Sequence, residues 1–66
     1  MEVLTAKEYI ERKPRLCIVR TEDGILGTNF VIIKDGRICQ TAMELVHGSE
    51  EAAIDFLQSI PEDEIG

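Results

Sequence analysis

Lysine and arginine are absent from residues 41–66 of this chain, although its 66 residues include seven basic ones. The same segment holds seven acidic residues, whereas residues 1–20 hold five basic and three acidic ones. The phosphates of nucleic acid would be repelled by such an acidic block, so we expect no direct binding of nucleic acid. A basic surface on a partner protein would suit the block, but an ordinary solvated acidic face explains it as well.

Long hydrophobic runs are also missing. No apolar stretch approaches the roughly 20 residues that a membrane helix needs, so we expect no contact with a membrane. The first residues lack the basic and then apolar layout of a signal peptide. We therefore place the protein in the cytoplasm, where free thiols are normal.

Metal-binding and nucleophilic residues are few, with two cysteines and one histidine. A structural zinc ion needs four ligands, which is more than Cys17, Cys39 and His47 supply. Catalysis by a cysteine needs a thiolate beside a base, but both cysteines stand among apolar residues, where burial raises the pKa of a thiol. We expect no metal, no cofactor and no enzymatic activity.

The short length of the chain limits its stability. Residues 1–66 are enough for one domain, and a domain of this size buries only about 60% of the surface of its unfolded chain. Small domains often gain stability from a disulfide, a metal or a partner subunit.

A helix is predicted near the beginning of the chain. Thr5 and Glu8 have the spacing of a capping box, and Leu4 and Tyr9 occupy the two positions of a hydrophobic staple. Pro14 excludes helical geometry from the residue before it, so the helix should end near Arg12.

Three strands are predicted next, over residues 15–21, 25–33 and 37–41, with Gly27 as a candidate bulge. Asp-Gly pairs separate them and favour tight turns. Consecutive strands tend to pair, so we expect a three-stranded antiparallel meander. Cys17 and Cys39 would then lie roughly 9–10 Å apart on the outer strands, beyond the reach of a disulfide.

Two alternatives are open for residues 42–47. Thr41 and Glu44 have the spacing of a second capping box, which predicts a short helix that ends at Gly48. The alternative extends the third strand through Val46. Both are compatible with an α+β fold of order α-β-β-β-α.

Ser49 is a suitable N-cap for the last helix. Four apolar residues at helical spacing predict its buried face, which comprises Ala53, Phe56, Leu57 and Ile60. Pro61 ends the helix, and residues 61–66 should form a mobile acidic tail.

Both faces of the predicted sheet are apolar, although small antiparallel sheets usually have one polar face. Either a helix covers each face, or one face or an edge is left to contact another chain, most simply as a homodimer. The candidate residues for that contact are Cys17, Val19, Val31 and Ile33.

The functional hypothesis is a small protein-binding module, an inhibitor or antagonist that occupies a basic surface of a partner, including one that normally holds nucleic acid. Small phage and mobile-element proteins share this size and charge, which is a likeness of class only. The alternatives are a homo-oligomeric structural or regulatory subunit and, third, a small enzyme. The partner-binding candidates are Glu44, Glu50, Glu51 and Asp55.

Overall fold

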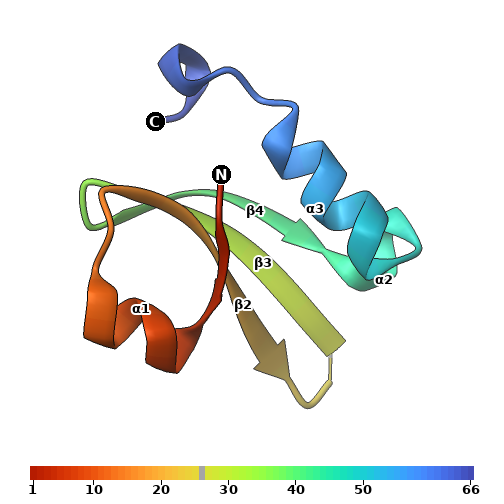
Figure 1. Ribbon diagram of the computed structural model, residues 1–66. Helices are drawn as coiled ribbons and strands as arrows, with labels where there is room; N and C mark the ends of the chain where they lie inside the picture. Colours follow the sequence, from red (N-terminus) through yellow and green to blue (C-terminus); the bar gives the residue numbers. More distant parts are fainter. Residues whose placement is uncertain (26) are drawn as a thin grey trace.

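Four strands lie side by side in a mixed sheet with the order β1-β2-β3-β4 (Figure 1). The computed structural model describes residues 1–25 and 27–66, apart from the side chain of Asp23. Strands β2, β3 and β4 form the predicted antiparallel meander, and the α+β fold class is confirmed. The strands are β1 (Val3–Thr5), β2 (Leu16–Asp23), β3 (Gly27–Lys34) and β4 (Arg37–Met43). Leu26, which we placed in the second strand, lies outside the described residues.

Strand β1 was not predicted from the sequence. It pairs in parallel with β2, with Val3 opposite Ile18, and the Ile18 N–H donates to the Glu2 carbonyl at 2.8 Å. Three residues give too short a run for an alternation of polar and apolar side chains to be recognised. The strand places Leu4 in the core.

Helix α1 (Ala6–Arg12) begins and ends as predicted. The Glu8 N–H donates to the Thr5 hydroxyl at 3.1 Å, and the Thr5 N–H donates to the Glu8 carboxylate at 3.0 Å, which confirms the capping box. Lys13 adopts the left-handed conformation with φ of 42°, so the helix ends before Pro14.

The turn between β3 and β4 is the predicted Asp-Gly hairpin. Asp35 and Gly36 have φ of 53° and 79°, and Lys34 pairs with Arg37 across them. Two consecutive left-handed residues fit the twist of a hairpin, and Asp-Gly is among the pairs that adopt them most readily. The expected bulge at Gly27 is wrong: Gly27 begins β3, and the register shift leaves Cys39 on β4 without a partner.

Each alternative for residues 42–47 is correct in part. Strand β4 continues to Met43, and helix α2 (Glu44–His47) follows and ends at Gly48. The second capping box is wrong, because Thr41 pairs with Val31 inside the sheet and no side chain caps α2. Pairing with β3 therefore outweighs the local preference for a cap.

Helix α3 (Glu50–Gln58) begins at the predicted cap, with the Ala52 N–H donating to the Ser49 hydroxyl at 3.1 Å. Ala53 and Leu57 are buried as expected. Phe56 is not: 44% of it is exposed, and Ile54 is among the residues that pack on the core instead.

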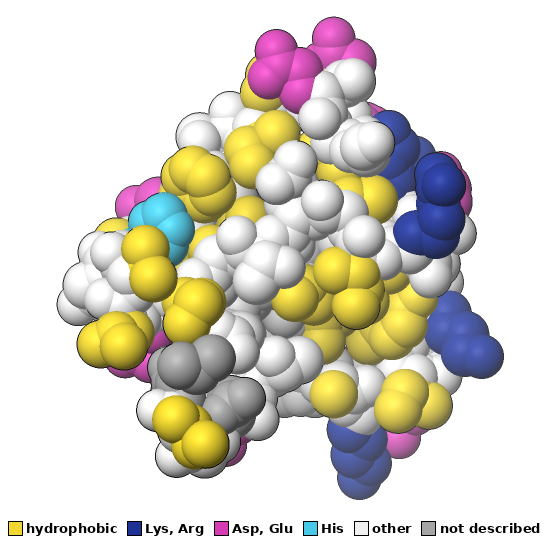
Figure 2. All heavy atoms as spheres, turned by 180° about the vertical axis from the view of Figure 1, so that it is seen from behind, with side chains coloured by type: hydrophobic (Ala, Val, Ile, Leu, Met, Phe, Trp, Pro, Cys, Tyr) yellow, Lys and Arg dark blue, Asp and Glu magenta, His cyan; other side chains and the backbone are white. Residues whose placement is uncertain are grey.

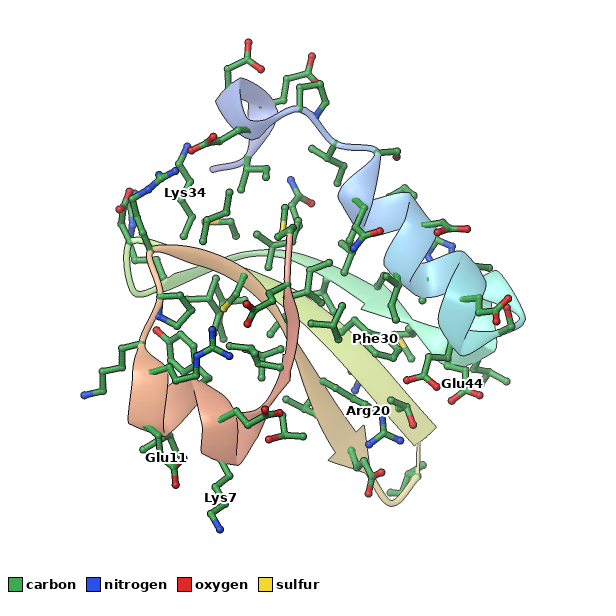
Figure 3. All side chains as sticks on the ribbon, in the orientation of Figure 1. Lys7, Glu11, Arg20, Phe30, Lys34 and Glu44 are labelled. Carbon is green, nitrogen blue, oxygen red and sulfur yellow. The ribbon has the colours of Figure 1, made fainter. Side chains whose placement is uncertain are left out.

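The core has two parts, one on each face of the sheet. Helix α3 and the C-terminal segment cover the first part, toward which Phe30 points in Figure 3. Helix α1 packs against the second part, to which the edge strand β1 contributes Leu4. Cluster 1 comprises Ile18, Phe30, Ile32, Ala42, Ala53, Leu57 and Ile65. Cluster 2 comprises Leu4, Cys17, Val19 and Ile33, with Tyr9 and Val31 packed against it.

The C-terminal segment contains a short 3-10 helix, η1 (Glu62–Glu64), and returns toward the β3–β4 turn (Figure 1). Ile65 is only 3% exposed and belongs to cluster 1. The Lys34 Nζ donates to the carbonyl of Ile65 at 3.1 Å (Figure 3). The sequence predicts a mobile tail here; its motion stays a prediction, but its contacts are those of a docked segment.

Replacing Ile65 by alanine should therefore destabilise the fold. Truncating a buried isoleucine costs roughly 2–5 kcal/mol, and we expect the lower end because a terminal segment can rearrange. Urea unfolding measures the loss. The control is Ile10→Ala, at a position 66% exposed on α1, where we expect a change within about 0.5 kcal/mol. Equal effects of the two changes would mean that Ile65 is not docked in solution.

Candidate interaction surface

The predicted acidic residues do not form one continuous face. Glu50 is engaged within the chain, since its carboxylate lies 3.3 Å from the Arg20 guanidinium, which also contacts Glu22 at 3.0 Å. Glu44 is half-buried at the first residue of α2, directly after β4. Of the four candidates, these two are the less available to a partner.

Glu51 and Asp55 remain as exposed charges on α3. They are four residues apart, so they lie on the same side of the helix, away from buried Ala53 and Leu57. Among the described residues, neither makes an ion pair. Their charge is therefore directed to solvent.

Exposed apolar side chains are found on α2, which packs against α3. The rings of His47 and Phe56 pack against each other with their centroids 4.7 Å apart. Leu45 and Val46 on α2 are both more than 70% exposed. Figure 2 shows hydrophobic side chains around the histidine, and acidic side chains at the same edge of the molecule in this view. We call the set of Leu45, Val46, His47, Glu51, Asp55 and Phe56 the α2–α3 corner.

Sequence reasoning missed the apolar half of this surface. Phe56 fits the helical spacing of the core residues as well as Leu57 does. Phe56 is exposed because it lies at the border of the buried face of α3, whereas Leu57 lies within that face. Leu45 and Val46 belong to residues 42–47, for which the sequence allows either a strand or a helix. The two alternatives would bury different side chains. A four-residue helix next to the Phe56 side of α3 was needed to bring them together.

The residues predicted to contact a second chain are mostly covered by their own chain. Cys17, Val19 and Ile33 are all buried in cluster 2, against which Tyr9 of α1 packs. Val31 is half-buried. Three of the four candidate residues are thus covered by their own chain, which corrects the expectation of an exposed apolar face here, and Val31 keeps the largest exposed fraction of the four.

The basic residues of the N-terminal third are largely paired with acids. Arg12 bonds to Glu2 at 2.8 Å, and Arg15 pairs with Glu62 of the C-terminal segment. Arg20 pairs with Glu22 and Glu50. Lys7 projects from α1 away from the sheet (Figure 3). Glu51 and Asp55 of the α2–α3 corner are not among the acids in these pairs.

The cysteines and the histidine lie in separate places. Cys17 lies in cluster 2, Cys39 packs against cluster 1, and His47 stacks on Phe56. Burial raises the pKa of the Cys17 thiol. The described residues contain no group of three side chains suited to a metal ion, and no helix among them could cross a membrane.

A small hollow lies at the beginning of β4. Its volume is about 180 Å³, and it is lined by Arg37, Ile38, Cys39 and Gly66. Ligand pockets usually have volumes of about 300–1,000 Å³. The α2–α3 corner is therefore the stronger candidate for a functional surface.

Comparison with known proteins finds no matching family model, no similar curated protein and no similar solved structure. The function is therefore inferred from the surface alone.

The two thiols should differ in reactivity. Cys17 is fully buried and its pKa is raised by burial, whereas Cys39 is half-buried. Because the thiolate is the reactive form, iodoacetamide should label Cys39 well before Cys17 in the folded protein. Mass spectrometry of timed samples follows the two sites. Equal rates in urea, where both are exposed, provide the control, and equal rates in the folded protein would contradict the burial of Cys17.

The docking of the C-terminal segment should depend on pH. The hydrogen bond from Arg15 lowers the pKa of Glu62 from its ordinary value of 4.5. Because this pKa is lowered, the ion pair of Arg15 with Glu62 contributes to stability above pH 4.5. The contribution is lost as the pH falls through the lower pKa that Glu62 has in the folded protein.

The test compares the wild type with Glu62→Gln by thermal unfolding at about pH 7 and about pH 3. The variant should be less stable at the higher pH and should match the wild type at the lower one. The hydrogen bond from the Thr5 backbone also lowers the pKa of Glu8. This second dependence of stability on pH is the same in the wild type and in Glu62→Gln, so it cancels in the comparison. A constant difference between them would show that the Arg15–Glu62 pair is not formed.

Proposed function

We propose that this protein is a small protein-binding module whose α2–α3 corner docks on a basic surface of a partner protein. The observation that carries the proposal is the exposure of Glu51 and Asp55 on α3, without an ion pair among the described residues. Phe56 is exposed on the same helix, and Leu45 and Val46 are exposed on α2, which packs against it. The module acts as an inhibitor or antagonist by occupying a site that a nucleic acid can also use.

The composition of the corner supports this proposal. Binding sites between proteins commonly combine an apolar, often aromatic centre with a polar rim. Here Phe56 and Val46 supply the centre, and the two carboxylates supply the rim. Carboxylates at such positions attract a basic partner and repel an acidic one, so they set both the rate of encounter and the choice of partner.

The anchoring of α3 also supports the proposal. Glu51, Asp55 and Phe56 all belong to a helix that is capped by Ser49. The ion pair between Arg20 and Glu50 joins the beginning of that helix to β2. Side chains on such a helix lose less conformational entropy on binding than those of a flexible segment.

Binding is favoured over catalysis by the placement of the reactive groups. Cys17 is buried with a raised pKa, and His47 is packed against Phe56 in a different part of the molecule. A nucleophile and its base need to be within hydrogen-bonding distance. The proposal also includes a cytoplasmic setting, in keeping with the free thiols of both cysteines, and an origin among small phage or mobile-element proteins.

The test uses two matched charge reversals. Glu51→Lys with Asp55→Lys reverses the corner, while Asp63→Lys with Glu64→Lys makes the same change in net charge on η1. Each protein is coupled to beads and exposed to an extract of the cells that make it. Proteins retained by the wild type are then purified, and their association rates with all three forms are measured at low and raised salt.

We expect the corner reversal to slow association by about tenfold and the η1 reversal to have little effect, since steering charges act near the contact. Binding of the wild type should weaken as salt is added. Circular dichroism shows whether each variant is folded, because the Glu51→Lys change also places a positive charge in the first turn of α3, where it opposes the helix dipole. Equal association rates for both variants, or binding indifferent to salt, would refute the proposal.

A further inference from the structure

Strand β4 is an edge of the sheet. Among the described residues, no strand pairs with its outer side, and the other edge is formed by the three-residue strand β1. Ile38 is 69% exposed on β4, and Thr41 is exposed near its middle. Edge strands with exposed backbone groups are sites at which another strand can be added.

The direction of the backbone groups on β4 follows from the neighbouring strands. The Asp35 N–H donates to the Arg15 carbonyl at 2.8 Å, on the β2 side. Backbone groups alternate in direction along a strand, so Ile33, Val31 and Asn29 also point toward β2. Their partners on β4 are Ile38, Thr41 and Met43, which therefore direct their N–H and C=O groups to the outer edge.

We propose that two copies of this chain pair through β4, antiparallel, about a two-fold axis at Thr41. Each copy then adds its four strands to one continuous sheet of two molecules. Thr41 lies opposite Thr41 of the second copy, and both present outward N–H and C=O groups there. The strand order within each copy is unchanged.

The bulge at Cys39 decides which residues of the two copies lie opposite each other in this register. Cys39 is the extra residue on β4, so counting outward from Thr41 brings Ile38 opposite Met43 of the second copy. The side chains of Ile38 and Met43 lie on the same face of the sheet as Val31 and Ile33. Ile38 pairs with Ile33, and Met43 pairs with Asn29, which is two residues from Val31 on β3. Beyond this pair, Arg37 of one copy comes near Glu44 of the second copy, because Glu44 begins α2 directly after Met43. Opposite charges then meet at both ends of the contact.

Other registers fit less well. A shift by one residue would bring side chains of opposite faces together. A shift by two would leave Ile38 or Met43 without an opposite residue on β4 and would separate Arg37 from Glu44. The register at Thr41 pairs the stretch from Ile38 to Met43 with the same stretch of the second copy, which favours a second copy over an unrelated extended peptide.

The test begins with sedimentation equilibrium over a range of micromolar concentrations, because a contact along one strand is small. We expect a species of twice the 7.4 kDa mass of one chain. Ile38→Lys should weaken the dimer about tenfold or more, since lysine on an edge strand discourages pairing. Ile10→Lys makes the same change at an equally exposed site on α1 and should leave the dimer intact.

The register is tested by exchanging charges. Arg37→Glu places two acids together at each end, and Glu44→Arg places two bases together, so each variant alone should dimerise about tenfold more weakly. An equal mixture of the two should restore dimers, because every contact between the different variants joins opposite charges. The double variant Arg37→Glu with Glu44→Arg should dimerise like the wild type.

Circular dichroism verifies that each variant is folded. A wild type that stays monomeric at all concentrations overturns the proposal, as does equal weakening by Ile38→Lys and Ile10→Lys. Failure of the mixture to associate more strongly than its components rules out the register. None of these variants changes Glu51 or Asp55, so the outcome is separate from that of partner binding by the α2–α3 corner.

Discussion

The pairing of β2 with β3 is the constraint on which the rest of the structure depends. Ile18 opposes Ile32 on one face, and Cys17 opposes Ile33 on the other, so the two central strands are apolar on both sides. A sheet of this kind is stable in water only when both faces are covered. With 66 residues, the chain must build two covers from very short elements.

Each cover is held by contacts at its ends. Helix α1 has only two turns, and a capping box and the Arg12–Glu2 ion pair join it to β1. On the other face, α3 is joined to the sheet by Arg20 and Glu50, and Ile65 extends the cover beyond the end of the helix. Short covers leave area at the margins. The α2–α3 corner and the outer edge of β4 both lie at such margins, which explains why apolar side chains are exposed there.

Much of this architecture could be read from the sequence. The helix at Thr5, the Asp35-Gly36 turn and the cap at Ser49 each depend on a few neighbouring residues, and all three are correct. Elements that depend on distant partners were harder to predict. Strand β1 exists because it pairs with β2, and Thr41 lies in β4 because Val31 lies opposite it. In both cases a tertiary contact decides between local structures of similar free energy.

The same distinction applies to the candidate site. The acidic character of residues 41–66 is visible in the composition, but which acids are free depends on the ion pairs of Arg15 and Arg20. The exposure of Phe56 likewise depends on how α2 lies against α3. Ile65, a single apolar residue after three acids, gives no periodic pattern from which its burial could be inferred.

The burial of Ile65 also bears on the order in which the chain can fold as it is synthesised. Every residue of cluster 2 has been made once Ile33 is added, whereas cluster 1 is incomplete until Ile65. The residues of cluster 2 are therefore complete about thirty residues before those of cluster 1, but a sheet with one bare face is not stable in water, so the stable fold requires Ile65 to have been added. In that interval Ile18, Phe30 and Ile32 are present without their cover, and the nascent chain exposes an apolar face that the folded protein buries.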